Sequence, residues 1–175
     1  MLERIWSGRR AAYVAGAPVR SCERTAETGS VYTQLLRSDA PDTDTHIVHR
    51  GDTCFAVANL FPYTTGHLLV VPYREVADLD GLTVEETADL WATVTDAVRV
   101  IRSVYAPDGM NVGLNLGRPA GGSVPDHLHV NVVPRWTGDS NFMSAIANTQ
   151  TLPEALEDTA AKLRAAWASM DGERQ

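Results

Sequence analysis

The chain has 175 residues, of which 44% are hydrophobic and 21% are charged, values typical of one globular domain. Its formal net charge is −7, which argues against a protein that holds nucleic acid through the phosphate backbone. Two cysteines exclude a disulfide scaffold and favour a cytoplasmic location. No apolar run approaches the roughly 18 residues that span a bilayer, and the first residues lack the pattern of a signal peptide, so we expect no membrane association.

The first strands are predicted from Thr45 onward. Residues 1–45 show no clear period, and the acidic stretch RSDAPDTDT predicts a loop. HIVHRG and TCFAVANL are apolar runs separated by Gly51 and Asp52, a spacing that predicts a β-hairpin. GHLLVVPYR predicts a third strand.

Two amphipathic helices follow from helical spacing. Thr83 and Glu86 form a capping box, which predicts a helix that runs to about Tyr105 and stops before Pro107. Its expected apolar face consists of Leu90, Trp91, Val94, Val98, Ile101 and Tyr105. From Thr151 a second helix is predicted by the spacing of Leu156, Ala160, Leu163 and Trp167.

The order of these elements predicts an α+β fold. MNVGLNLG and HLHVNVVPRW predict a fourth and a fifth strand, joined by the glycine-rich turn GRPAGGSVPD. Three strands, a helix and two strands do not alternate as βαβ units, so we expect a five-stranded, mainly antiparallel sheet. The long helix packs on one face, which leaves the other free for a site. We expect a domain over residues 46–150, an N-terminal segment over 1–45 that is partly loop, and a C-terminal helix and tail over 151–175.

The segment HLHVNVV carries the strongest chemical signal. Because side chains alternate along a strand, His127, His129 and Asn131 share one face. The opposite face, directed into the core, holds Leu128, Val130 and Val132. From this pattern alone, a polar strand face turned to solvent and a metal site both remain open. A metal would lack a clear third ligand, since His46 and His49 lie on another strand.

The glycine-rich turn before this segment favours phosphate chemistry. Asn115, Gly122 and Ser123 belong to a donor-rich loop, and backbone N–H groups in glycine conformations can hold phosphate oxygens. Next to two histidines, such a loop suggests an imidazole that attacks phosphorus.

The motif and the residues before it resemble the histidine-triad family of nucleotide hydrolases and transferases. The resemblance covers about residues 45–143 and includes FAVANLFPYTTGHLLVVPYREVADLDGLTVEETADLW and HLHVNVVPRWTGDSNFM. Within the family, the chain is most similar to actinobacterial diadenosine tetraphosphate phosphorylases. The resemblance implies a HIT-like fold and an enzyme that forms an adenylyl-histidine intermediate.

The resemblance also implies roles by position. His129 would be the nucleophile at the α-phosphorus, and His127 would hold the hydrogen-bond network of the site. His67 would lie beside them, although a histidine in the core explains it nearly as well. The remaining implied contacts are Asn59 with ribose, Asn115, Gly122 and Ser123 with phosphate, Leu68 with adenine, Trp136 with a second subunit, and Asn141, Phe142 and Met143 with the base or the subunit interface.

Two residues depart from the family pattern. The third triad position is Asn131, whose amide donates a hydrogen bond but cannot transfer a proton. An amine leaving group needs such a proton, whereas a nucleoside polyphosphate leaves as a stabilised anion, so Asn131 favours a dinucleoside polyphosphate substrate. Many bacterial members have a C-x-x-C that helps to bind zinc, but here Thr25 stands in place of the second cysteine, three residues after Cys22, so we predict no metal and no cofactor.

The leading hypothesis is cleavage of diadenosine tetraphosphate by orthophosphate, which gives ATP and ADP. A hydrolase of the same family, in which water replaces phosphate, is the second hypothesis. The third is a nucleotide-binding module with little catalysis. We expect the partners to be the nucleotide, orthophosphate and further copies of the chain in a homodimer or homotetramer. A requirement for a divalent cation does not follow from the sequence.

Overall fold

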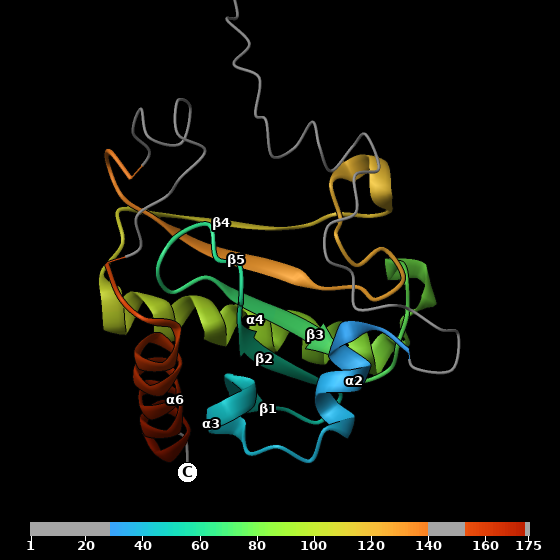
Figure 1. Ribbon diagram of the computed structural model, residues 1–175, viewed down its shortest axis with the longest axis horizontal. Helices are drawn as coiled ribbons and strands as arrows, with labels where there is room; N and C mark the ends of the chain where they lie inside the picture. The colour runs from blue at the N-terminus through green and yellow to red at the C-terminus, as the bar shows by residue number, and fades with distance from the viewer. Residues whose placement is uncertain (1–28, 140–152, 174–175) are drawn as a thin grey trace, which may run out of the picture.

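A computed structural model of the protein describes residues 29–139 and 153–173. Its strands form one antiparallel sheet in the order β1-β2-β3-β5-β4 (Figure 1). This order confirms the predicted α+β class and the hairpin around Gly51. The strands are β1 (Ile47–Arg50), β2 (Cys54–Ala58), β3 (Leu68–Pro72), β4 (Gly109–Leu114) and β5 (Val130–Arg135). The helices are α2 (Val31–Arg37), α3 (Asp42–Thr45), α4 (Val84–Tyr105) and α6 (Leu156–Glu173), with short 3-10 turns η1 (Leu79–Gly81) and η2 (Arg118–Ala120).

Helix α4 covers one face of the sheet, as predicted. The Thr83 hydroxyl accepts from the N–H of Glu86, and the Glu86 carboxylate accepts from the N–H of Thr83, which closes the capping box. The helix packs against β2, β3 and β5. The predicted apolar face was wrong at Trp91, which is 43% exposed. The buried face is instead Leu90, Thr93, Val94, Ala97, Val100 and Ile101.

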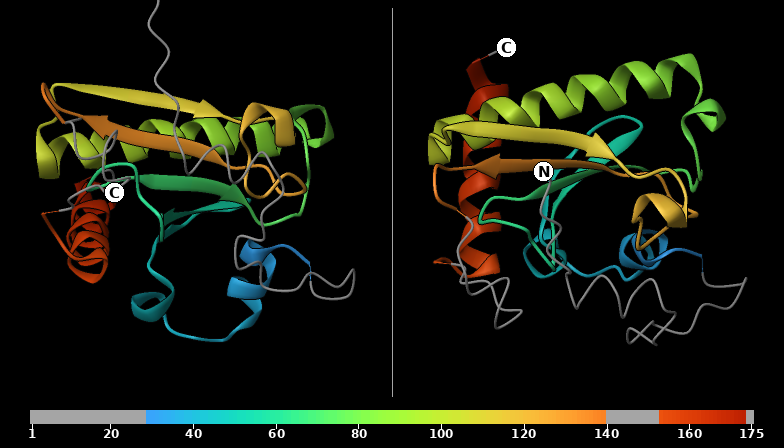
Figure 2. Two further views of the ribbon diagram at one scale, coloured as in Figure 1. Left: turned by 45° about the horizontal axis from the view of Figure 1, so that its top comes forward. Right: turned by 90° about the horizontal axis from the view of Figure 1, so that it is seen from above.

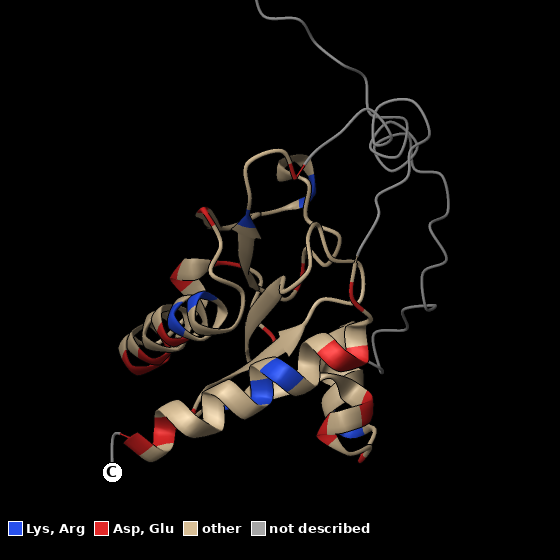
Figure 3. Cartoon of the chain, turned by 90° about the vertical axis from the view of Figure 1, so that its left-hand side faces the viewer, with Lys and Arg blue, Asp and Glu red and all other residues tan. Residues whose placement is uncertain are grey.

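Helix α6 completes the same core from the C-terminal end of the chain. Ala160, Leu163 and Trp167 are buried there, as their spacing predicted. The Arg164 guanidinium donates to the backbone oxygens of Asp42 (2.8 Å) and Ile47 (2.7 Å), so α6 also holds the start of β1. Lys162 and Arg164 lie between acidic residues near both ends of the helix (Figure 3). No helix in residues 29–139 or 153–173 is long and apolar enough to cross a membrane.

Helix α2 lies on the face of the sheet opposite α4, which was expected to be free (Figure 2, right). Its N-cap is Ser30, whose hydroxyl accepts from the N–H of Thr33. Its Tyr32 packs into a second core with residues of β1, β2 and β3, namely Ile47, Phe55, Val57, Leu69 and Val71. The sequence did not predict α2. The predicted loop at residues 37–45 was also wrong at α3, a single helical turn.

Candidate active site

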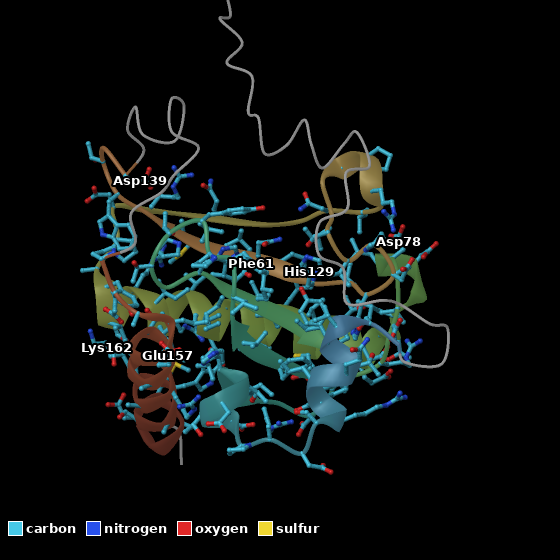
Figure 4. The ribbon with its side chains drawn as sticks, in the orientation of Figure 1. Phe61, Asp78, His129, Asp139, Glu157 and Lys162 are labelled. Atoms are coloured by element: carbon cyan, nitrogen blue, oxygen red, sulfur yellow. The ribbon has the colours of Figure 1, made fainter. Side chains whose placement is uncertain are left out.

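The two motif histidines lie directly before β5, on the side of the sheet that carries α2. Their rings are almost fully buried, at 0% exposure for His127 and 6% for His129. The alternative of a strand face turned to solvent is therefore wrong. The alternation itself is confirmed, because Leu128, Val130 and Val132 pack in the core with α4. Figure 4 labels His129 beside the start of β5.

The hydrogen bonds of His129 leave one nitrogen of its ring free to react. Its Nδ1 lies 3.0 Å from the backbone oxygen of His127. A carbonyl only accepts, so Nδ1 carries the proton and Nε2 keeps its lone pair. Burial lowers the pKa of His129, mainly because the charged ring loses solvation. The ring is thus neutral at pH 7, the state that a nucleophile needs.

The ring of His127 is held at both nitrogens. Its Nε2 donates to the backbone oxygen of Pro72 (2.8 Å), and its Nδ1 lies 2.5 Å from the hydroxyl of Ser30. Burial also lowers the pKa of His127. The ring of His127 is therefore inaccessible to solvent and fixed in its orientation.

His67 belongs to a second hydrogen-bond chain that reaches the triad strand. The N–H of Tyr63 donates to Nδ1 (3.1 Å), so that nitrogen accepts and Nε2 carries the proton. Nε2 then donates to Oδ1 of Asn131 (3.1 Å). Burial lowers the pKa of His67 to about 4, which keeps the ring neutral. Asn59 lies at the other end of this chain, with its Nδ2 3.3 Å from Nδ1 of His67.

The orientation of Asn131 follows from this chain. Its oxygen accepts from His67, so its amide nitrogen faces the other way, toward the backbone oxygen of Gly113 at 3.4 Å. That contact is long for a hydrogen bond. The amide therefore keeps donor capacity for a substrate oxygen, while it has no proton to transfer.

The glycine-rich loop brings Asn115 and Gly122 together. A Cβ atom built on Gly122 would lie 3.4 Å from the backbone oxygens of Asn115 and Gly117, so these parts of the loop are in close van der Waals range. Gly117 and Gly121 adopt positive φ angles of 74° and 96°, the region that glycine favours. Ser123 is exposed at the end of this turn. The loop therefore turns tightly through glycine conformations that other residues rarely adopt.

Leu68 does not fit its predicted contact with a base. It is fully buried and packs toward α4, on the face of the sheet opposite Asn131. Its neighbour Leu69 pairs with Asn131 between β3 and β5 and packs in the core around Tyr32. Leu69 is thus the β3 leucine on the face that carries the site.

Some predicted site features remain untested by the structure. Trp136 is half-buried just after β5, and its backbone N–H donates to the carboxylate of Asp139 (3.2 Å). Both observations fit a residue at the rim of the sheet. Asn141, Phe142, Met143 and Cys22 lie outside the described residues. In the part of the chain that the structure describes, no three His, Cys, Asp or Glu side chains gather as a metal site requires. The absence of a metal stays a prediction.

Comparison with known proteins identifies the family. A family model described as the HIT domain matches residues 40–138, more than half of the chain. The chain belongs to the histidine-triad (HIT) family. This HIT protein is 46% identical to the AP-4-A phosphorylase of Mycobacterium tuberculosis over 168 residues, which cover 95% of this chain and 85% of that protein. The predicted actinobacterial resemblance is thereby confirmed.

More distant relatives span different activities. The bis(5'-nucleosyl)-tetraphosphatase [asymmetrical] of Schizosaccharomyces pombe is 37% identical over 106 residues, 61% of this HIT chain and 57% of that protein. Among solved structures, a Zn-bound histidine triad family protein from Mycobacterium smegmatis superposes with a TM-score of 0.67 at 28% identity, and the match covers 85% of this chain and 99% of that one.

Sequence reasoning missed the residues that enclose the two histidines. Ser30 and Tyr32 come from α2, and the backbone oxygen of Pro72 comes from the end of β3. A serine directly before an apolar run was the one signal for the helix cap. Nothing in the sequence links that cap to a histidine that follows 97 residues later.

Proposed function

We propose that the protein is a diadenosine tetraphosphate phosphorylase, which cleaves its substrate with orthophosphate and releases ATP and ADP. One observation carries the proposal: a buried, neutral His129 presents a free Nε2 in a HIT chain that is 46% identical to an AP-4-A phosphorylase. The geometry supports nucleophilic catalysis, and the relative supports the substrate and the acceptor.

The first step makes an adenylyl enzyme. The Nε2 lone pair of His129 attacks the α-phosphorus, and the bond from that phosphorus to the bridging oxygen breaks, so the electron pair leaves with ATP. The ring becomes cationic, and its Nδ1–H donates to the His127 carbonyl, which stabilises the positive charge. A neutral ring at the start means that no proton has to be removed first.

The second step transfers the adenylyl group. An oxygen of orthophosphate attacks the same phosphorus, the bond from nitrogen to phosphorus breaks, and the electron pair returns to Nε2. The products are ADP and neutral His129. Asn131 supports this substrate class, because ATP leaves as an anion that needs little help from an acid. The amide of Asn131 donates a hydrogen bond to a phosphate oxygen in both steps.

Hydrolysis is the second candidate function. The 37% identity to a bis(5'-nucleosyl)-tetraphosphatase favours it, since water would then take the place of orthophosphate in the second step. The first step and the role of His129 are the same in both reactions. The candidates therefore differ only in the acceptor.

Product analysis with labelled orthophosphate tests the proposal. The protein is incubated with diadenosine tetraphosphate with and without ³²P-orthophosphate, and the nucleotides are separated. Phosphorolysis puts the label into ADP, and the rate depends on phosphate. Unlabelled AMP at a rate independent of phosphate would establish the hydrolase instead, and the absence of any cleavage would favour the nucleotide-binding module. The same assay with a chelator tests for a divalent cation.

The functional unit is proposed to be a homodimer or homotetramer that works in the cytoplasm. β4 lies at an edge of the sheet, so its outer backbone groups are available to a second copy. Trp136, half-buried just beyond β5, is the proposed anchor, since tryptophan is enriched at the centre of interfaces. Sedimentation of Trp136→Ala against the parent protein tests this: weaker association supports the proposal, and unchanged association contradicts it.

A further inference from the structure

Helix α2 reaches the histidine pair through its N-cap residue. The side chain of Ser30 is only 1% exposed, and its hydroxyl oxygen lies 2.5 Å from Nδ1 of His127. The same oxygen accepts from the backbone N–H of Thr33 (3.2 Å), and the Thr33 hydroxyl lies 3.2 Å away, so Nδ1 of His127 is the nearer acceptor for the Ser30 hydroxyl proton. A helix cap needs only the second of these contacts. The contact with His127 therefore needs a separate explanation.

The direction of that hydrogen bond is set by the backbone. The oxygen of Pro72 only accepts, so Nε2 of His127 must carry the ring proton. Nδ1 is then an acceptor, and the Ser30 hydroxyl donates to it. The bond from Ser30 supports one tautomer and one orientation of the His127 ring.

Ser30 is itself anchored by Glu75. One carboxylate oxygen of Glu75 accepts from the N–H of Ser30 (2.8 Å) and from the hydroxyl of Thr33 (2.6 Å). The next residue, Val76, accepts from the N–H of Leu128 (2.6 Å) through its backbone oxygen. The short segment after β3 thus holds α2 on one side and the His127–Leu128 peptide on the other.

That peptide carries the oxygen that fixes the nucleophile. The Nδ1–H of His129 donates to the carbonyl of His127. The ring and the backbone carbonyl of His127 together therefore position the ring of His129. Tyr32, two residues after Ser30, packs edge-on against His127 at 5.4 Å between ring centroids and lies 5.5 Å from His129. Helix α2 therefore contacts both rings.

We propose that Ser30 is a positioning residue for His129 and acts through His127. The inference rests on the proposed function, since it takes His129 as the nucleophile. A reacting nitrogen that is displaced by about 1 Å can cost on the order of 100-fold in rate. The Ser30 hydroxyl prevents such a displacement by holding the supporting ring, without contact with the substrate.

The test compares Ser30→Ala with two matched variants. Thr83→Ala removes the N-cap of α4, which is exposed and belongs to the opposite face of the sheet, so it controls for the loss of a cap. Ser30→Thr keeps the hydroxyl. We expect kcat of Ser30→Ala to fall about tenfold while KM changes less than about twofold, because the loss affects the reacting geometry. Thr83→Ala should keep the parent kcat, and Ser30→Thr should restore most of it.

Nitrogen-15 NMR of the histidine side chains gives a readout independent of turnover. In the parent protein, Nδ1 of His127 should show the shift of a hydrogen-bonded acceptor nitrogen. In Ser30→Ala that nitrogen should move toward the shift of a free acceptor, and the resonances of His129 should broaden or move. Thr83→Ala should leave both rings unchanged. Ser30→Cys, which has a weak donor of nearly the same shape, replaces Ser30→Ala if the latter does not fold.

Two results would overturn the inference. One is a parent-like kcat in Ser30→Ala together with unchanged histidine resonances. The other is an equal loss of kcat in Ser30→Ala and Thr83→Ala, which would reduce Ser30 to an ordinary cap. If the parent protein does not cleave diadenosine tetraphosphate, the proposed function fails, but the NMR comparison still decides whether Ser30 positions the two rings.

Discussion

Three buried imidazoles of the candidate site are held in the neutral form. Burial lowers the pKa values of His67, His127 and His129, and each ring has a backbone partner that selects its tautomer. Pro72 and His127 supply carbonyl acceptors, whereas Tyr63 supplies an N–H donor. Because these partners are backbone atoms, the positions of the protons follow from the fold.

His129→Ala tests the nucleophile. We expect kcat on diadenosine tetraphosphate to fall by at least about 1000-fold, since removal of a covalent nucleophile closes the pathway. The matched control is His49→Ala, which removes an imidazole that stacks on Trp167 from β1 at the edge of the sheet. Nucleotide binding and thermal unfolding are measured for both. Retention of more than about a tenth of kcat, a change of about 1.4 kcal/mol, would refute the assignment.

Asn131→His tests the link between the third triad position and the leaving group. The new ring can accept from Nε2 of His67 with one nitrogen, as Oδ1 of the asparagine does, and carry a proton on the other. We expect little gain on diadenosine tetraphosphate and a gain of up to about 100-fold on an adenosine phosphoramidate. Rates on both substrates provide the measurement. A large and equal gain on both would mean that Asn131 disables the enzyme.

The leucine pair of β3 shows where sequence reasoning fails at single residues. All five residues of β3 are buried, because α4 covers one face and α2 the other. A strand with two covered faces loses the alternation of polar and apolar residues from which facing is read. Leu68 and Leu69 are chemically identical, so the sequence cannot show which of them lies on the face of the site.

Helices α4 and α2 mark the two extremes of predictability. Helix α4 has 22 residues, a capping box and a regular apolar stripe, and its bounds were predicted closely. Helix α2 has seven residues and no acidic residue in its first turn, so periodicity has too few turns in which to appear. Packing of Tyr32 on the sheet stabilises it, and packing between distant segments is not visible in local sequence.

Gly66→Ala tests the turn that leads from β2 to His67. Gly66 has a φ of 84°, and an added Cβ would lie 3.0 Å from the ring of Tyr105 at the end of α4. Strain in the backbone and the close contact should together lower the free energy of unfolding by about 2 kcal/mol. Urea denaturation measures it. Gly109→Ala is the control, since nothing lies within 4 Å of its added Cβ, and an equal loss there would contradict the explanation.

At the scale of the whole molecule, the buried histidines predict loss of stability in acid. His67 has a pKa of about 4 in the folded protein, against 6.5 as its ordinary value. Between these two pH values His67 binds more protons in the unfolded chain than in the folded protein. The contribution of neutral His67 to the free energy of unfolding is therefore complete above about pH 6.5 and declines as the pH falls toward 4. From His67 alone we expect about 2 kcal/mol less stability at pH 5 than at pH 7.5. Urea denaturation at both pH values measures the change, and in His67→Gln the decline should be smaller. An equal decline in both proteins would remove His67 as its source.

The contacts of Arg164 and Trp167 determine when the fold can be completed during synthesis. Arg164 binds the backbone oxygen of Ile47, 117 residues earlier in the chain, and Trp167 fills the core beneath α4. Until α6 has left the ribosome, the apolar side of β1 and α4 lacks this cover. A nascent chain that already contains the histidines therefore still exposes core surface, which makes it a substrate for chaperones and for aggregation. The helix that closes the core is thus made after the whole sheet and the histidines.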